Sequence, residues 1–499
     1  MRPSPFKHRP LRILQCNING LGTAATRIKL DQLLELAETK EIQIIALQET
    51  KLKETSKLKV KGYNVFRSDR KTGGAGGGLA FLVRNIQYQS IDTPQFDNTK
   101  LEIQGISFPW RGKNIKVFNS YHPPCSSSLP DCFFQGYENN IFFLGDLNAK
   151  HPNWGCSNSN ARGNALLNLA DDKSFLFLND GSPTHSSHSY NTKEALDISI
   201  VSPDIYPQCN WTVLSNIGSD HYPILIELDI NQKVSRDRRN HWNFRKADWK
   251  RYNDLTNSGV FNEPLTNNID SNWTAFENGI ISAAKQSVPR GKVKKYTPFF
   301  SHNSDTLKPL LKRREALSNL ISSNSGNTSD KTELNRVNAE IKRKYALLKR
   351  QRWREFCTSL DSRTPESKLW KLVKSIDKSQ PQSESCNTIL APDGSVPSGH
   401  KEAADILGLH YSNISKLSFT NPDKTIARRA RILANRHRNK KASDPLFSAH
   451  FSLQELEFAI GNLKLSKSPG PDGIYGHMIL HLGNLLKAQT HQTATDPLP

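Results

Sequence analysis

The sequence predicts a four-layer α/β (α+β) sandwich, in which two mixed β-sheets are flanked by helices, followed by a mostly helical basic region. Two observations support this fold class. From Arg12 to about Ile230, short apolar runs of strand length alternate with segments of helical periodicity. After Asn231 the composition changes, because residues 234–245 are polar and basic and helical patterns follow them.

Apolar runs bounded by turn residues predict the strands of both sheets. They span residues 12–18, 42–47, 63–66, 79–83, 103–108, 115–121, 141–144, 196–201, 211–214 and 224–230. Two helices are expected between them. Their inward faces would be Leu30, Leu33, Leu34 and Ala37 in the first and Leu166, Leu167 and Ala170 in the second.

The glycine run from Gly73 to Gly78 is not a phosphate-binding loop. It has no Gly-Lys-Ser/Thr ending and it precedes a strand rather than a helix. Glycines beside a strand instead predict a close approach of two backbone segments at a sheet edge.

The second half of the chain contains a long basic helix at about 331–360. Apolar residues three or four positions apart form one face, namely Leu334, Val337, Ile341, Tyr345 and Leu348. A solvated amphipathic helix explains this pattern equally well. We favour nucleic-acid binding because Trp353 and Phe356 lie among the positive charges. The candidate binding residues are Lys342, Arg343, Lys344, Lys349, Arg350 and Arg352.

The remaining patterns suggest four parts. We expect the sandwich at 11–230, a linker at 231–300, a basic helical connector at 301–445 and a last part at 446–499. Ser322 to Ser329 and Ser379 to Ser385 are serine-rich and are expected to be flexible joints. In the last part, Ser452 and Glu455 form a capping box, which predicts a helix with Leu456, Ala459, Ile460 and Leu463 facing inward.

The overall charge narrows the class of partner. Lys and Arg number 68 against 47 Asp and Glu, a net charge of +21, which suits a polyanion such as nucleic acid. The seven cysteines form no CxxC pair, so reduced thiols in an intracellular protein are expected. The proline-rich basic start contains no secretory signal, and no apolar stretch is long enough to span a membrane, so we expect no membrane partner.

Polar residues stand at the ends of several predicted strands. Asp146 and Asn148 follow the apolar run 141–144, and similar residues stand at the other strand ends. The full set is Asn17, Glu49, Tyr121, Asp146, Asn148, Asp197, Asp220 and His221. Carboxylate and amide oxygens are ligands that suit Mg²⁺ or Mn²⁺ rather than zinc, and converging acids need a cation to offset their repulsion.

Ser219-Asp220-His221 provides a histidine beside these acids. A lone histidine before a strand is more often structural. Next to carboxylates that hold its tautomer, it becomes a candidate general base that activates water for hydrolysis of a phosphate ester. His185 and His188 form an HxxH in a serine-rich stretch without partner cysteines, and a solvated polar loop is the better interpretation for them.

Six motifs in this order resemble the endonuclease/exonuclease/phosphatase superfamily, and more narrowly the apurinic-type endonuclease domain of jockey-like non-LTR retrotransposons. They are LQCNINGL, LQET, SYHPP, GDLNAKHPNWG, ALDISIV and GSDHYPI, between about Leu11 and Ile230. Asn153-Trp154-Gly155 and Arg162-Gly163 resemble the retrotransposon branch rather than the repair enzymes.

The resemblance implies a role for each strand-end residue. Asn17 and Glu49 would hold the metal, with Asp220 as a further acid on the metal side. Tyr121 would contact the scissile phosphate and Asn148 would bind the transition state. Asp146 would serve the nucleophile or the leaving group, and Asp197 would orient His221.

The second half resembles the same elements. Residues 242–249 are similar to the segment after the endonuclease, and 467–474 (KSPGPDGI) to the opening of the reverse transcriptase fingers. The resemblance thus implies a Mg²⁺-dependent DNA endonuclease that leaves a 3′-hydroxyl, fused to an incomplete reverse transcriptase. DNA would be the target, element RNA a partner, and the nucleus the place of action.

Two departures from the family pattern leave alternatives open. The segment between Tyr121 and Ile141 is short, which questions the packing beneath Asp146. No aromatic-x-Asp-Asp palm motif follows the fingers stretch, and Asp171-Asp172 is better explained as the acidic surface of a helix. We therefore expect no polymerase activity from this chain. A decayed element that only binds nucleic acid, or a phosphatase or phospholipase of the same superfamily, are the alternatives.

Overall fold

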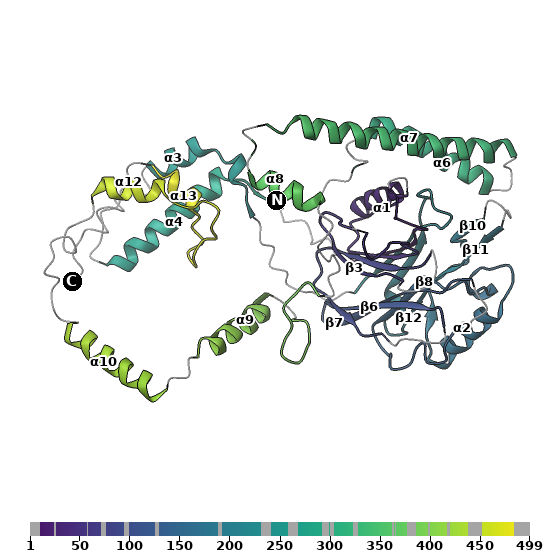
Figure 1. Ribbon diagram of the computed structural model, residues 1–499, viewed down its shortest axis with the longest axis horizontal. Coiled ribbons are helices and arrows are strands. Elements are labelled where there is room, and N and C mark those ends of the chain that lie inside the picture. The colour runs from purple at the N-terminus through teal and green to yellow at the C-terminus, as the bar shows by residue number, and fades with distance from the viewer. Residues whose placement is uncertain are drawn as a thin grey trace, which may run out of the picture. The chain divides into compact units, whose positions relative to one another are not determined.

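The computed structural model describes most of the chain in two compact units. The described residues are 10–23, 26–56, 58–70, 76–93, 99–124, 129–187, 192–230, 241–257, 268–291, 299, 304–322, 328–361, 364, 366–376, 386–397, 400–416, 420–437 and 452–483. One unit spans 1–235 and 295–415, and the other spans 236–294 and 416–499. Both units are drawn in Figure 1.

The first unit contains the predicted sandwich. Its first six-stranded sheet has the order β13-β14-β1-β2-β4-β3. The strands are β1 (Leu11–Asn17), β2 (Ile44–Gln48), β3 (Asn64–Ser68), β4 (Leu79–Val83), β13 (Cys209–Val213) and β14 (Ile224–Leu228). Strands β1 and β2 are parallel and the other pairs are antiparallel, so the sheet is mixed as expected.

The second six-stranded sheet has the order β5-β6-β7-β8-β12-β9. Its strands are β5 (Gln89–Ile91), β6 (Glu102–Trp110), β7 (Lys113–Tyr121), β8 (Ile141–Asp146), β9 (Leu176–Phe177) and β12 (Asp197–Val201). A separate ribbon pairs β10 (His185–Ser187) with β11 (Thr192–Glu194). The short strands β5, β9, β10 and β11 have no alternating pattern long enough to be predicted from the sequence.

Three apolar layers hold the sandwich together. Ile13, Phe81, Phe108 and Phe142 belong to the layer between the two sheets. Helix α1 (Arg27–Thr39) covers the first sheet through the predicted face Leu30, Leu33, Leu34 and Ala37. Helix α2 (Ala161–Asp172) covers the second sheet (Figure 1). The four-layer sandwich predicted from the sequence is thus confirmed.

The described residues between Tyr121 and Ile141 are 122–124 and 129–140, and aromatic residues among them pack closely although the segment is short. Phe133 and Phe134 are each 1% exposed and lie against Phe143 of β8 at ring-centroid distances of 5.3 and 4.8 Å. Phe134 also stacks on Phe175 at 4.8 Å. Large aromatic rings therefore fill the layer beneath Asp146. Each ring buries more area than an aliphatic side chain, so few residues are needed.

The first unit also includes a helical hairpin from the basic region. Helix α6 (Ser304–Ser322) pairs with α7 (Thr328–Thr358), and their apolar residues form a core that includes Ile28 of α1. The predicted apolar face is confirmed, since Leu334, Val337, Ile341 and Tyr345 are buried. Helices α8 (Glu366–Ile376) and α9 (His400–Ile414) follow. The predicted joint at 379–385 and most of the joint at 322–329 lie outside the described residues.

The second unit joins two segments far apart in the chain. It contains β15 (His241–Trp242), α3 (Trp249–Asn257), α4 (Ile269–Ser287), β16 (Arg290–Gly291), α10 (Asn421–His437), α12 (Leu453–Gly461) and α13 (Gly476–Leu480). Tyr252, Ile280 and Ala284 pack with Ile474 and Met478 in one core. The range 231–300, which we predicted as a linker, therefore contains two packed helices in this structure.

The capping box at Ser452 and Glu455 is confirmed, since both reciprocal hydrogen bonds are present. The face predicted to point inward is only partly buried. Ile460 is 9% exposed, whereas Leu463 is 37% exposed and Ala459 is exposed. No described helix has the length and apolar character needed to cross a membrane.

Candidate active site

Strand topology brings the predicted strand-end residues to one edge of the sandwich. The parallel strands β1 and β2 end at Asn17 and Gln48, and β7 and β8 end together at Tyr121 and Asp146. Strands β12 and β14 run antiparallel to β8 and β1, so their beginnings lie at this same edge. Asp197 is the first residue of β12, and Asp220 and His221 precede β14, so antiparallel pairing brings all three to the others.

Polar bridges between the two sheets fix this edge. Gln48 Nε2 donates a hydrogen bond to Asn119 Oδ1 at 2.6 Å, and Asn119 Nδ2 donates to the Leu47 carbonyl at 3.0 Å. Ser199 Oγ and Gln15 Oε1 form a third bridge at 3.0 Å. Buried polar groups hydrogen-bonded in this way set the register between the sheets, since a shift would leave them unpaired.

Asn17 connects two of the carboxylates. Its Nδ2 donates to Glu49 Oε1 at 3.0 Å and to Asp146 Oδ2 at 2.8 Å. Its Oδ1 accepts a hydrogen bond from the Asn19 backbone N–H at 3.0 Å, which defines the orientation of the amide. Asn17 therefore presents a donor to the carboxylates here, and its predicted role as a metal ligand would require the amide to turn over.

Glu49 is held in its ionised form. Burial alone would raise its pKa, but hydrogen bonds from Asn17, Lys51 and Tyr121 outweigh burial, so the pKa is lowered. Lys51 Nζ lies 2.8 Å from Glu49 Oε2. Burial, Glu49 and Asp146 together raise the pKa of Tyr121, so its hydroxyl stays protonated and can donate a hydrogen bond.

His221 is paired with Asp197. Its Nδ1–H donates to Asp197 Oδ2 at 2.7 Å, and its Nε2 lies 3.8 Å from Asp146 Oδ2. Burial opposes the charged imidazolium, but Asp197, Asp146 and Asp220 outweigh it and raise the pKa of His221 to about 10. Burial raises the pKa of Asp146 to about 7. The site thus combines a buried histidine whose charged form is favoured by neighbouring carboxylates with a buried acid whose pKa is raised.

The backbone around these residues is unusual. Asn19, Glu49, Lys51 and Asn148 have positive φ angles of 45°, 50°, 51° and 49°, in a region that residues with a side chain rarely adopt. Strained residues of this kind cluster at functional sites. At Asn148, the turn places the backbone N–H 3.1 Å from Asp146 Oδ1 and lets Nδ2 donate to the His122 carbonyl at 3.0 Å.

Three residues of this network, Asn19, Lys29 and Lys51, were not among those predicted from the sequence. Asn19 Nδ2 donates to both oxygens of Asp220 at 3.1 and 3.0 Å, and Lys51 Nζ donates to Asn19 Oδ1 at 2.6 Å. Lys29 of α1 donates to the Asn19 carbonyl at 2.7 Å. Asn19 lies two positions after Asn17, and Lys51 two positions after Glu49. Because Asp146 and Asn148 have the same spacing, this pattern could have predicted both residues from the sequence.

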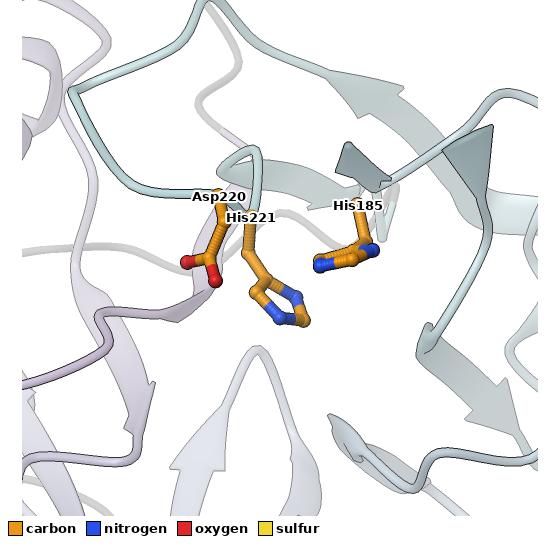
Figure 2. A group of neighbouring side chains, drawn as sticks. All are labelled: His185, Asp220 and His221. Atoms are coloured by element: carbon orange, nitrogen blue, oxygen red, sulfur yellow. The ribbon is translucent and has the colours of Figure 1, made fainter. Parts of the chain in front are cut away.

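His185 does not lie in a solvated loop, which corrects our interpretation of the HxxH. It lies on β10 and is half-buried, and its ring centroid is 4.6 Å from that of His221 (Figure 2). His188 lies outside the described residues. His185, Asp220 and His221 each offer one ligand atom within 4.8 Å of the others, as do Asp146, Asp197 and His221.

The residues at this edge fit a divalent cation. Glu49, Asp146 and Asp220 provide carboxylate oxygens, which hard cations prefer. Lys51 Nζ already contacts oxygens of both Glu49 and Asn19, so a positive charge is accommodated between them. One oxygen of Asp197 is buried without a hydrogen-bond partner. Among the described residues, the groups whose ligand atoms lie close enough together to hold an ion are Asp146 with Asp197 and His221, and His185 with Asp220 and His221.

The candidate nucleic-acid residues of α7 differ in their surroundings. Lys342, Arg343, Arg350 and Arg352 are exposed, whereas Lys344 pairs with Glu340 at 3.1 Å. Lys349 lies 2.9 Å from Asp31 of α1 and 4.3 Å from the centroid of the Phe299 ring. A cavity of about 390 Å³ lies beside it, lined by five cations, Arg27, Lys59, Lys61, Lys349 and Arg352, and by Asp31.

Comparison with known proteins identifies the class of domain. Residues 115–225 match the family described as "Endonuclease-reverse transcriptase". The chain is 26% identical over 74% of its length to a "Probable RNA-directed DNA polymerase from transposon X-element" of Drosophila melanogaster, covering 41% of that protein. It is 22% identical over 86% of its length to the "RNA-directed DNA polymerase from mobile element jockey" of Drosophila funebris, covering 47% of that protein.

Among solved structures, the "Endonuclease domain of TRAS1, a telomere-specific non-LTR retrotransposon" aligns with 45% of this chain and 100% of that one, with 22% identity and a TM-score of 0.36. An AP endonuclease from Archaeoglobus fulgidus aligns with 44% of this chain and 100% of that one, with 17% identity and a TM-score of 0.32.

The first unit therefore contains a region, residues 115–225, that matches an endonuclease family. Over most of its length the chain is similar to the proteins of jockey-like non-LTR retrotransposons, which are named RNA-directed DNA polymerases. It spans about half the length of the curated relatives that it matches. The recognition made from the six motifs is thus confirmed.

Proposed function

We propose that the chain is a Mg²⁺-dependent DNA endonuclease that nicks a target strand and leaves a 3′-hydroxyl. The observation that carries the proposal is the arrangement of Asp197, His221 and Asp146, with separations of 2.7 and 3.8 Å between successive partners. A histidine oriented by one carboxylate and facing another acid is suited to acid–base catalysis of hydrolysis.

The proton transfers follow from this arrangement. Asp197 holds the Nδ1–H of His221, which leaves Nε2 as the atom that takes a proton from water. The water oxygen then forms a bond to phosphorus while the bond from phosphorus to the 3′ oxygen breaks. Asp146, whose pKa is raised to about 7 by burial, is suited to return a proton to the leaving 3′ oxygen.

The remaining groups stabilise charge. Tyr121 keeps its hydroxyl proton and can donate to a phosphate oxygen, and Asn148 offers an amide at the same edge. When bound, Mg²⁺ or Mn²⁺ held by Glu49 and Asp220 would supply positive charge that offsets the charge developing on the phosphate. Asn17 would orient Glu49 and Asp146 through the hydrogen bonds it donates to both.

Positive charge beyond the site favours DNA as the substrate. Lys29 and Lys51 lie at the site edge, and the cavity between α1 and α7 is lined by five further cations. A small phosphate ester would need none of this surface, whereas each cation near a DNA phosphate releases a counterion. We propose element RNA as a second partner and the nucleus as the place of action, where chromosomal DNA lies.

Nicking of a supercoiled plasmid tests the proposal. The purified chain should convert supercoiled to open-circular DNA with Mg²⁺ and not with excess chelator, and the nicks should be extendable by a DNA polymerase without phosphatase treatment. His221→Ala should lose about 10²–10⁴-fold in rate and keep DNA binding. A wild-type chain that binds but never nicks, or one that releases phosphate from an inositol phosphate instead, would replace this function with one of the alternatives.

Polymerase activity stays a separate prediction. The relatives are named RNA-directed DNA polymerases, and this chain spans about half of their length. Primer extension on an RNA template with Mg²⁺ measures it directly, and we expect no products above a mock preparation.

A further inference from the structure

The loop 214–219 leads directly into Asp220 and His221, and a helix from the basic region holds it. Arg314 of α6 donates from Nη2 to the backbone carbonyl of Asn216. Glu315, the next residue, accepts a hydrogen bond from Ser215 Oγ at 2.6 Å. These two contacts join positions 98 and 100 residues apart in the chain.

Hydrogen bonds inside the loop connect Asn216 with the residues next to Asp220 and His221. Asn216 accepts the Gly218 backbone N–H through Oδ1, and its Nδ2 donates to the Ser219 carbonyl at 3.0 Å. Ser219 Oγ in turn donates to the Asn17 carbonyl at 3.1 Å. A fixed Asn216 therefore fixes the backbone from which Asp220 and His221 project.

Arg314 is buried, whereas the adjacent Arg313 is exposed. Arg314 is 6% exposed, and burial lowers the pKa of its guanidinium to about 10. The adjacent Arg313 has a side chain that is 59% exposed and pairs with Glu333 of α7. Arginine is rarely buried unless it has a partner, so the buried position of Arg314 against the loop is specific.

The hairpin is in turn anchored on the sandwich. Leu307 and Leu310 of α6 pack with Val337, Ile341 and Tyr345 of α7, and Ile28 of α1 belongs to the same core. Tyr345 also donates its hydroxyl to Asp31, and Lys349 lies 2.9 Å from the same carboxylate. The position of Arg314 is thus determined by packing rather than by a surface contact.

We propose that the α6–α7 hairpin clamps the catalytic loop 214–219 and that Arg314 is a positioning residue for His221 and Asp220. The hairpin then supports the catalytic loop of the sandwich. The positioning role of Arg314 in catalysis, which is the kinetic half of the proposal, rests on the proposed endonuclease function. The contact that holds the loop 214–219, which is the structural half, does not depend on that function.

Hydrogen–deuterium exchange on the full chain without DNA tests the structural half. In Arg314→Ala, peptides covering 214–222 should exchange faster, while Arg314→Lys should restore part of the protection and the matched control Arg313→Ala should leave it unchanged. Should Arg314→Ala also loosen 304–358, Ser215→Ala decides, because it removes the Glu315 contact without touching the hairpin core. Unchanged exchange at 214–222 in both variants overturns the clamp.

The kinetics of DNA nicking test whether Arg314 positions the catalytic residues. Because a displacement of about 1 Å can cost about 10²-fold in rate, kcat of Arg314→Ala should fall by roughly 10- to 100-fold with little change in KM. Arg313→Ala should keep the wild-type kcat. A loosened loop with an unchanged kcat would overturn the positioning role. Failure of the wild-type chain to nick would count against the endonuclease function alone, since the exchange result stands without it.

Discussion

Asp197 Oδ2 accepts the Nδ1–H of His221 at 2.7 Å, although Asp197 begins β12 of the second sheet and His221 precedes β14 of the first, 24 positions further along the chain. Both residues are buried at this edge of the sandwich, Asp197 at 0% and His221 at 5% exposed. With Asp146 beside it, this pair determines how the site responds to pH.

Activity should rise with pH along a limb whose midpoint lies above the usual histidine value. The carboxylates of Asp197 and Asp146 outweigh burial and raise the pKa of His221 to about 10, and only the deprotonated imidazole can take a proton. Asp197→Asn removes one negative charge, so the limb should move to lower pH while the maximal rate falls. A pH–rate profile of single-turnover nicking measures both, and a limb that stays in place would show that Asp197 does not set the pKa.

Glu49→Gln should abolish most Mg²⁺-dependent nicking while the fold remains intact. Gln keeps the shape of the side chain but offers a neutral oxygen, and even the loss of a group behind a ligand costs about 10–100-fold in metal affinity or activity. The rate measured against Mg²⁺ concentration should show a weaker apparent affinity. Glu38→Gln, at a surface carboxylate paired with Arg84 at 2.6 Å, is the control and should behave as wild type.

Gly145→Ala should destabilise the domain by roughly 1–3 kcal/mol or more, because it overpacks the core. A Cβ at this position would lie 2.0 Å from the Ser120 carbonyl oxygen of the neighbouring parallel strand β7. The glycine of the GDLN motif is thus required by strand packing rather than by chemistry. Urea denaturation measures the effect. Gly408→Ala in α9, where a Cβ would meet nothing within 4 Å, is the control and should not reduce stability.

Lys59→Glu combined with Lys61→Glu should weaken DNA binding and reduce its salt dependence. Both side chains line the cavity beside Lys349 and Arg352, and the log–log salt slope should fall by about 0.9 for each DNA phosphate that is no longer neutralised. Lys401→Glu with Lys424→Glu makes the same charge change on α9 and α10. If both double variants lower the slope equally, net charge and not the cavity is responsible.

The double variants test DNA binding more directly than a deletion of residues 331–360 would. Val337, Ile341 and Tyr345 of α7 are 1%, 2% and 5% exposed in a shared core. Deleting the helix would therefore remove packing together with charge, and a loss of DNA binding could not be attributed to either.

The sequence by itself determined the sandwich and the set of residues at its edge. Apolar runs such as 141–144 and the helical face of Leu30, Leu33 and Leu34 are local patterns, and burial follows directly from them. The eight strand-end residues were found for the same reason, since a polar residue that borders a buried strand must lie at its end. Six ordered motifs then identified the superfamily.

Only the tertiary structure decided which partner each residue has. Whether Asn17 shows its oxygen or its nitrogen to the carboxylates depends on the Asn19 backbone N–H. Three further contacts depend on segments far away in the chain. His185 lies beside His221, Lys349 pairs with Asp31, and Arg314 is buried against the loop 214–219. A periodic pattern shows that a side chain is buried or charged, but long-range packing alone determines what it meets, because that contact depends on the path of the whole chain.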